Sequence, residues 1–197
     1  FLQLTRSLTS ARRIRAVLEE QPALATPADP IAAVADGSID FADVSFKYSA
    51  AAARDALSHV TLHIPAGATV GIIGGTGAAK TTLVQLIPRL YDATSGTVKG
   101  GGQDVRRYYL AALRDAVGIV LQKNLLFSGT IRDNLRWGDP NADDETLWAA
   151  CRAACADEFL ERMPDGLDTD MGQGGVNVSG GQKQRLCIAR TLLKRPK

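Results

Sequence analysis

Residues 74–82 read GGTGAAKTT, a stretch whose residue types suit the binding of a polyphosphate. A polyphosphate carries several negative oxygens, and a loop holds them when successive backbone N–H groups turn inward and the following helix directs its positive end at them. Gly74, Gly75 and Gly77 supply the backbone freedom for that turn, and the Lys80 ammonium would reach the β- and γ-phosphates. The stretch therefore predicts a phosphate-binding loop.

The position before the lysine departs from the pattern G-x-x-x-x-G-K-[ST], because it holds Ala79 in place of glycine. We expect φ below zero at Ala79, as at most helix starts, and there an alanine costs nothing. A left-handed φ would cost about 1–2 kcal/mol. The Thr81 hydroxyl is the expected ligand of Mg²⁺, and Thr76, Ala78 and Thr82 complete the loop.

The segments around this loop fit a buried α/β core. ATVGIIG, residues 68–74, is a short apolar run bounded by glycines, as expected of a strand buried on both faces. TTLVQLIPRL, residues 81–90, predicts a helix that ends near Pro88. AVGIVLQ, residues 116–122, predicts a second buried strand. Strand, glycine-rich turn and helix in this order are the context that a phosphate loop requires.

Other segments predict a half-exposed sheet and a run of helices. GSIDFADVSFKY (37–48) and HVTLHI (59–64) alternate apolar and polar residues, which predicts two or three antiparallel strands. SGTIRDNLRW and DDETLWAACRAACADEFLERM, which lie between residues 128 and 163, predict helices.

Residues 1–20 predict an amphipathic helix, and residues 21–36 predict a linker. Apolar residues recur at helical spacing over residues 1–20, at Leu4, Leu8, Ala11, Ile14 and Leu18. Three prolines then interrupt any helix across residues 21–36, at positions 22, 27 and 30. The abrupt start at Phe1 suggests a segment cut from a longer chain.

VSGGQKQR, residues 178–185, forms a second candidate anion site. Ser179 is the expected N-cap of a helix, and the two glycines behind it leave bare N–H groups where an anion can dock. The inward residues of this helix are expected to be Leu186, Ile188 or Ala189, and Leu192 or Leu193. One nucleotide has little use for two γ-phosphate clamps from one chain, so the second would serve the nucleotide of a neighbouring chain.

The two motifs in this order resemble the nucleotide-binding domain of ABC transporters, and the resemblance spans the whole chain. GGTGAAKTT is similar to the Walker A loop, and Ser179, Gly180, Gly181 and Gln182 are similar to the signature motif. Gln122, within VLQKNLLFSGTIRDNL, is similar to the Q-loop glutamine, which would join Thr81 at Mg²⁺ and sense the γ-phosphate. Tyr48 is similar to the aromatic residue that stacks on adenine.

The resemblance implies an α/β fold: a P-loop NTPase core with an antiparallel β subdomain and a helical signature-motif subdomain. Residues 1–36 would be the cytoplasmic end of a transmembrane helix and a linker. Residues 37–197 would be the nucleotide-binding domain with its C-terminal part absent, and residues 124–180 its helical subdomain.

The resemblance also implies an exporter-type transporter. LFSGTIRDNL is typical of exporters, and DTDMGQGG is similar to the loop that contacts their membrane domains, although Gln173 and Gly174 depart from its usual charged pattern. ATP with Mg²⁺ would be sandwiched between this domain and a second one, in a homodimer or a heterodimer. The transmembrane domain of the same chain would lie in the cell membrane, with this domain on its cytoplasmic face.

The resemblance places the residues of ATP hydrolysis after Lys197: the Walker B aspartate, the catalytic glutamate and a switch histidine. No catalytic residue is therefore expected within this sequence, although the full-length protein would hydrolyse ATP. A central strand of the sheet would also be missing, so the chain should expose apolar surface and fold poorly or aggregate by itself.

Three other functions compete with this interpretation. The chain could be the regulatory half of a heterodimer that binds ATP without hydrolysing it, for which Ala79 and the QGG stretch are hints. It could also be a non-transport ABC ATPase that works on DNA or ribosomes, against which the exporter-like segment and the N-terminal helix argue. A small-molecule P-loop kinase is disfavoured, because it has no use for the SGGQ helix.

Composition adds little to the motifs. The formal charge is +2, from 23 basic and 21 acidic residues, which does not favour nucleic acid as a partner. Cys151, Cys155 and Cys187 lack metal-site spacing, and His59 and His63 do not obviously complete a site, so reduced thiols are expected. No uninterrupted apolar run is long enough to cross a bilayer, and no secretory leader is visible.

Overall fold

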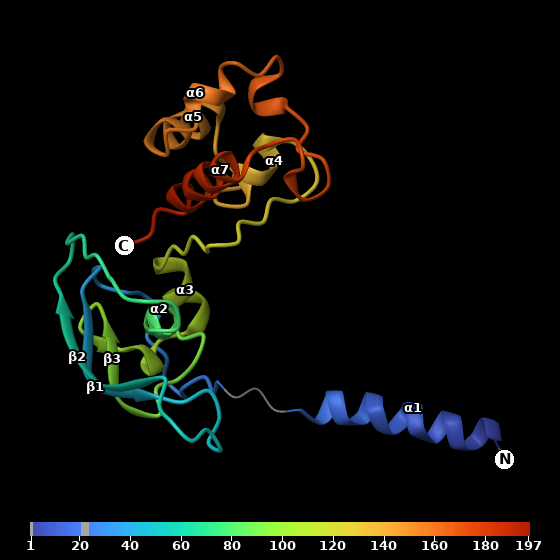
Figure 1. The fold of residues 1–197 in the computed structure, drawn as a ribbon, viewed down its shortest axis with the longest axis vertical. Coiled ribbons are helices and arrows are strands. Elements are labelled where there is room, and N and C mark those ends of the chain that lie inside the picture. Colours follow the sequence, from blue (N-terminus) through green and yellow to red (C-terminus); the bar gives the residue numbers. More distant parts are fainter. Residues whose placement is uncertain (1, 21–23) are drawn as a thin grey trace.

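The computed structural model describes residues 2–20 and 24–197. The predictions for Phe1 and Pro22, and the side chain of Leu4, lie outside the described part. Figure 1 shows two lobes, joined by an extended segment, and a separate helix that projects from the lower lobe. We call the lower lobe, residues 31–116, the sheet lobe and the upper one, residues 126–193, the helical lobe.

The sheet lobe is built on a four-stranded antiparallel sheet. Its strands are β1 (Ile39–Phe46), β2 (Leu57–Ile64), β3 (Ser95–Gly100) and β4 (Gln103–Asp104), in the order β2-β1-β3-β4. The expected antiparallel sheet over residues 37–64 is confirmed, with β1 as its central strand. β3 and β4 were not predicted, because SGTVKG carries too few apolar residues to reveal a strand.

Two helices close the core of the sheet lobe. They are α2 (Lys80–Leu86) and α3 (Leu110–Ala116), and the turn before α3 contains the 3₁₀ helix η1 (Val105–Arg107). The buried side chains of the sheet pack against Leu86 of α2 and Leu113 of α3, and they include Phe41, Val44, Phe46 and Val98. The phosphate loop therefore leads into a helix that is anchored in this core.

The two strands expected at residues 68–74 and 116–122 do not form. Neither segment contains a strand or pairs with a strand of the described chain, and Ala116 is the last residue of α3. A strand buried in a parallel sheet needs neighbours on both edges to satisfy its backbone groups, and none lies beside these segments. The expected apolar surface is confirmed here, since Ile73 is 99% exposed and Val70, Ile72 and Leu121 are also exposed.

The helical lobe has its own apolar core. Its helices are α4 (Ile131–Arg136), α5 (Asp144–Ala153), α6 (Asp157–Leu160) and α7 (Gly180–Leu193), with 3₁₀ turns η2 (Gly166–Asp168) and η3 (Gln173–Gly175) between α6 and α7. α7 buries Leu186, Cys187, Ala189 and Leu193, which resolves the two open choices in favour of Ala189 and Leu193.

The N-terminal helix α1 (Leu2–Glu19) is confirmed, and it stands away from both lobes (Figure 1). Its described side chains, from Arg6 onward, are exposed. After it, Ile31 pairs with the backbone beside Tyr108 and joins the linker to the sheet lobe. Among the described residues, no helix combines the length and apolarity needed to cross a bilayer.

Asn134 holds the first residues of the helical lobe in place. It is buried on α4, and its Nδ2 donates to the carbonyl oxygens of Phe127 and Thr130, both at 2.9 Å. Its Oδ1 accepts from the Phe127 backbone N–H at 2.7 Å. One amide therefore satisfies both backbone groups of Phe127.

We predict that Asn134→Ala lowers the free energy of unfolding by about 2 kcal/mol, because the backbone groups of Phe127 lose their buried partner. Urea denaturation followed by circular dichroism measures this change. The exposed Asn141 is the matched control, and Asn141→Ala should leave the unfolding curve unchanged. Equal unfolding curves for Asn134→Ala and the wild type would contradict the prediction and show that water replaces the hydrogen bonds of Asn134.

Candidate functional site

The phosphate loop lies between β2 and α2 and is open to solvent. Residues 71–78 are exposed, and Gly77 has a left-handed φ of 83° that glycine adopts without strain. The expectation for Ala79 is wrong, because it has φ 54° and ψ 22°. The chain must turn sharply at this position to start α2 at Lys80, and the turn demands the conformation that glycine would adopt more easily.

The Lys80 side chain folds back over the loop. Its Nζ donates to the carbonyl oxygens of Gly74 and Gly75, at 2.7 and 2.8 Å. The ammonium therefore lies at the centre of the loop, where phosphate oxygens would have to dock. Both partners are neutral carbonyls, so an anion would compete with them on favourable terms.

Tyr48 lies beside this loop. A cavity of about 400 Å³ is lined by Tyr48 and by the end of the phosphate loop, with Asp55, Ala56 and residues 77–82 completing its wall. The Tyr48 hydroxyl lies 2.8 Å from Thr82 Oγ1, and the Tyr48 side chain is 57% exposed. The structure therefore brings the expected aromatic residue to the expected loop, with its ring accessible to a ligand.

Tyr48 packs against two other aromatic residues. Its ring meets those of Phe46 and Tyr91 edge-on, at centroid distances of 4.9 and 5.3 Å. Edge-to-face pairs of this kind fix ring orientation. Tyr91 follows α2, so the phosphate loop and the aromatic wall belong to one packed unit.

Asp55 was not predicted as a site residue. It lines the cavity and lies 3.3 Å from Lys47 Nζ in an ion pair. The surrounding stretch, AAARDAL, contains no motif and no periodicity, so only the fold reveals its position.

Gln122 and the signature motif lie outside this cavity. Gln122 is exposed in the extended segment between the lobes and does not line the cavity around Lys80. Ser179, Gly180, Gly181 and Gln182 begin α7 in the helical lobe. The structure therefore does not bring Gln122 together with Thr81.

The start of α7 has the features expected of an anion site. Ser179 is confirmed as the N-cap: its Oγ accepts from the Gln182 N–H at 3.3 Å, and Gln182 Oε1 accepts from the Ser179 N–H at 2.8 Å. Open space surrounds Gly180 and Gly181. Lys183 Nζ donates to the Gly174 carbonyl at 2.9 Å and holds the preceding loop against the helix.

The loop before α7 is tied to the lobe by ion pairs at its start. Arg132 of α4 binds the carboxylates of Asp144 and Asp168. The hydrogen bond to Asp168, followed by that to Asp144, raises the pKa of Arg132 above its usual value. The bond to Arg132 also lowers the pKa of the Asp168 carboxyl. Gln173 and Gly174 follow these pairs as an uncharged turn, in which Gly174 has φ 67°.

The cysteines and histidines do not form a metal site among the described residues. Cys151 and Cys187 are buried free thiols, and Cys155 is exposed. Burial raises the pKa of the Cys151 thiol to about 11. His59 and His63 lie in the other lobe and bind Asp43 and Asp40.

Comparison with known proteins identifies the family of the chain. The family model described as ABC transporter matches residues 57–197, well over half of the chain. The chain belongs to the ABC transporter family. The expected α/β fold of an ABC ATPase is thereby confirmed, and the loop at residues 74–82 lies within the matched residues.

Relatives of this ABC transporter chain include exporters. It is 41% identical over 187 residues to a multidrug efflux ATP-binding/permease protein of Mycobacterium bovis, covering 95% of this chain and 16% of that protein. It is 40% identical over 191 residues to an ATP-dependent lipid A-core flippase of Desulfotalea psychrophila, covering 96% of this chain and 33% of that protein. The chain therefore spans a third or less of the length of these relatives.

A solved structure of the same family has the same fold. A bacterial Atm1-family ABC exporter with ATP bound is similar to this chain with a TM-score of 0.88 and 35% identity, over 98% of this chain and 33% of that one. The two-lobed arrangement of this ABC transporter chain is thus shared with an ATP-bound exporter.

We predict that Ala79→Gly raises the free energy of unfolding by about 1 kcal/mol, because glycine adopts the left-handed φ of this position without strain. Urea denaturation measures the change. The neighbouring Ala78 is the control: its φ is not left-handed, and Ala78→Gly should leave stability equal or lower. A loss of stability in Ala79→Gly would contradict the left-handed geometry.

Proposed function

We propose that this chain is the ATP-binding domain of an exporter-type ABC transporter, in which MgATP binding joins two such domains and drives export across a membrane. The observation that carries the proposal is the single cavity shared by Lys80, Thr81 and Tyr48. The names of the relatives, which include a permease, a flippase and an exporter, support the direction of transport.

The residues of the cavity fit a nucleotide triphosphate. Lys80 already lies in the loop on two carbonyl oxygens, which it can exchange for phosphate oxygens. Residues 74–77 are exposed and would offer backbone N–H groups, and the exposed Tyr48 would offer its ring to adenine. Bound MgATP would supply the charge that holds two domains together and the free energy released by hydrolysis.

Two further roles rest on residues that this structure keeps apart from the cavity. We propose that Gln122 joins Thr81 at Mg²⁺ when the extended segment moves toward the loop. Ser179, Gly180, Gly181 and Gln182 would meet the γ-phosphate held by the partner domain, because their open helix end lies in the other lobe. Closure would thus depend on two chains, identical or different.

We propose that residues 1–36 connect the domain of residues 37–197 to the membrane, with the end of this connection packed on the sheet lobe through Ile31 and the buried Val34. Helix α1 projects freely and could continue into a transmembrane helix, so that residues 37–197 lie on the cytoplasmic face of the cell membrane. Hydrolysis itself would use groups supplied outside residues 1–197.

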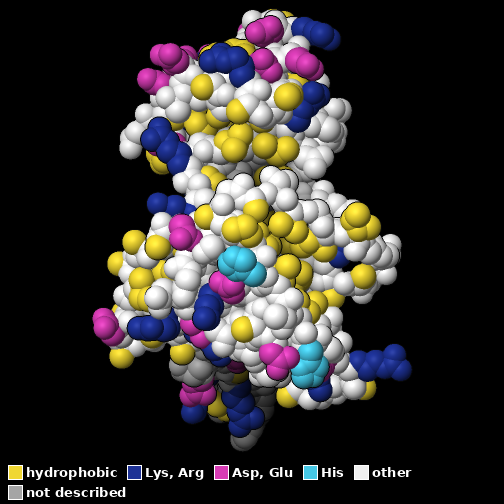
Figure 2. All heavy atoms as spheres, turned by 90° about the vertical axis from the view of Figure 1, so that its left-hand side faces the viewer, with side chains coloured by type: hydrophobic (Ala, Val, Ile, Leu, Met, Phe, Trp, Pro, Cys, Tyr) yellow, Lys and Arg dark blue, Asp and Glu magenta, His cyan; other side chains and the backbone are white. Residues whose placement is uncertain are grey.

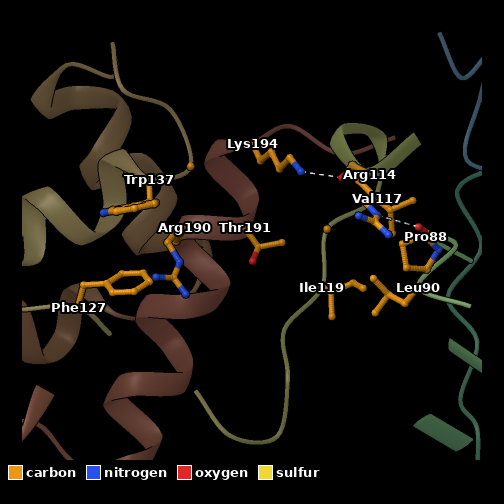
Figure 3. Close-up of a pocket in the computed structure, with 12 residues that line it drawn as sticks. Pro88, Leu90, Arg114, Val117, Ile119, Phe127, Trp137, Arg190, Thr191 and Lys194 are labelled. Atoms are coloured by element: carbon orange, nitrogen blue, oxygen red, sulfur yellow. Dashed lines mark hydrogen bonds between the residues drawn. The ribbon is translucent and has the colours of Figure 1, made fainter. Parts of the chain in front are cut away.

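We propose that the membrane domain contacts this chain at a cavity between the lobes. A cavity of about 380 Å³ there is lined by Phe127 and Trp137 of the helical lobe and by Pro88, Leu90 and Ile119 on the other side (Figure 3). The two aromatic rings stack at 4.8 Å, and Trp137 is 68% exposed. Figure 2 shows hydrophobic side chains gathered where the lobes meet. Exposed aromatic pairs at such a junction mark protein contacts.

We predict that Lys80→Ala weakens ATP binding at least about tenfold, because the phosphates lose their charged donor. Isothermal titration calorimetry with MgATP measures the affinity. Lys99, a lysine on β3 that does not line the cavity, is the control, and Lys99→Ala should bind ATP as the wild type does. An unchanged affinity in Lys80→Ala would overturn the proposed site.

We predict that Trp137→Ala leaves ATP affinity unchanged and lowers transport by the full-length protein, because the ring lies at the junction and outside the nucleotide cavity. Substrate efflux and ATPase activity are measured side by side in membranes. Trp148→Ala, which alters the other tryptophan within the helical lobe, controls for lobe stability. Normal transport in Trp137→Ala would exclude this contact.

One specific observation favours a second function. The left-handed Ala79 strains the loop, which suits a regulatory site that holds ATP without hydrolysing it. Lys80→Ala in the full-length transporter separates the two: lost ATPase activity supports a hydrolytic site, whereas lost transport with ATPase retained supports a regulatory one. A non-transport ABC ATPase remains disfavoured by the permease and exporter names of the relatives.

A further inference from the structure

The linker that follows α1 is held to the sheet lobe by a buried arginine. Arg89 is 4% exposed, and its Nη2 donates to the carbonyl oxygen of Ala25 at 3.0 Å. The same guanidinium forms a two-point pair with Asp92, through Nε to Oδ1 at 2.6 Å and Nη2 to Oδ2 at 3.0 Å. The fork geometry of arginine lets one side chain satisfy both partners.

Arg89 occupies a conformation that its surroundings impose. Its φ is 53°, in the left-handed region that non-glycine residues seldom adopt. Arg114 of α3 holds the backbone there, with Nε donating to the Pro88 carbonyl at 3.3 Å and Nη2 to the Arg89 carbonyl at 3.0 Å. A strained backbone that is fixed by neighbours on two sides marks a position with a demanding geometric role.

The linker is attached at two points. Ala25 is bound by Arg89, and Ile31 exchanges backbone hydrogen bonds with Arg107 and Tyr109, at 2.8 and 2.9 Å. We call the segment between them, residues 24–31, the strap. Both attachments use backbone atoms of the strap, and the Leu24 residue faces the hollow described below.

The strap runs beside the aromatic wall of the nucleotide cavity. Leu24 lines a hollow of about 610 Å³ whose other walls include Phe46, Tyr48 and Tyr91. Asp92, the partner of Arg89, directly follows Tyr91 and lines the same hollow. The Arg89–Asp92 pair, which holds the strap, is therefore adjacent in the chain and in space to Tyr91, which packs against the Tyr48 ring.

We propose that Arg89 is a positioning residue for the base of the nucleotide, acting through the strap and the Tyr91–Tyr48 contact. Arg89 binds both Ala25 of the strap, which follows α1, and Asp92, which follows Tyr91. A displacement of the strap would therefore shift Tyr91 and, through their ring contact, Tyr48. This inference rests on the proposed function of the cavity.

The test compares ATP with inorganic tripolyphosphate, which carries the phosphates without the base. The full-length wild-type protein should bind MgATP more tightly than tripolyphosphate, because Tyr48 would contact adenine. Arg89→Ala should weaken MgATP binding by about fivefold to tenfold, part of the value of one base stack, and leave tripolyphosphate within about twofold. Arg89→Lys should recover part of the ATP affinity, since the charge remains opposite Asp92.

Two further variants control for folding. Arg132→Ala removes the arginine–aspartate pair with Asp168 in the helical lobe, away from the strap and the nucleotide cavity, and it should change neither affinity. Leu24→Ala shortens a side chain of the strap and leaves the Arg89–Asp92 pair intact. It should also weaken ATP binding, and this tests the inference even if Arg89→Ala does not fold. Hydrogen exchange of the amides in residues 24–31 should be faster in Arg89→Ala than in the wild type.

Several results would overturn the inference. Equal losses for ATP and tripolyphosphate would show that Arg89 only stabilises the lobe. Faster exchange of the strap with an unchanged ATP affinity would show that the strap is not coupled to the base. If the wild type bound MgATP and tripolyphosphate equally tightly, the proposed contact between Tyr48 and adenine would be wrong. That part of the proposed function would then be wrong as well.

Discussion

The structure depends on one constraint: a loop that binds phosphate must leave its backbone donors unpaired in solvent and still keep a defined shape. In this chain the shape comes from the loop's own lysine. Lys80 donates to the carbonyl oxygens of Gly74 and Gly75, while Gly77 and Ala79 take left-handed φ values that carry the chain into α2. The loop is thus organised before any anion arrives, which lowers the entropy lost on binding.

That organisation requires an anchor, and the sheet lobe provides it. α2 packs through Leu86 on the core of the antiparallel sheet, and the same sheet carries Tyr48 to within hydrogen-bonding distance of Thr82. The helical lobe has a separate core and presents the start of α7 elsewhere. Two lobes with separate cores and an extended connection would allow the two candidate anion-binding elements to serve different nucleotides, as the proposed dimer requires.

The sequence predicts those features that local chemistry decides. The glycine-rich loop, the Ser179 cap and the alternating strands each follow from residue types at fixed spacing. It does not predict features that depend on distant neighbours. Residues 68–74 have the composition of a buried strand, yet they remain unpaired because no strand of the described chain lies beside them. The left-handed φ of Ala79 is set by the turn into α2, and Asp55 reaches the cavity through the fold alone.

The most direct measurement is a structure of the full-length protein with a non-hydrolysable MgATP analogue. Our account predicts that Lys80 Nζ leaves the two glycine carbonyl oxygens for the β- and γ-phosphates, with the loop backbone unchanged and the base against Tyr48. An analogue bound elsewhere, with Lys80 still on Gly74 and Gly75, would contradict the account.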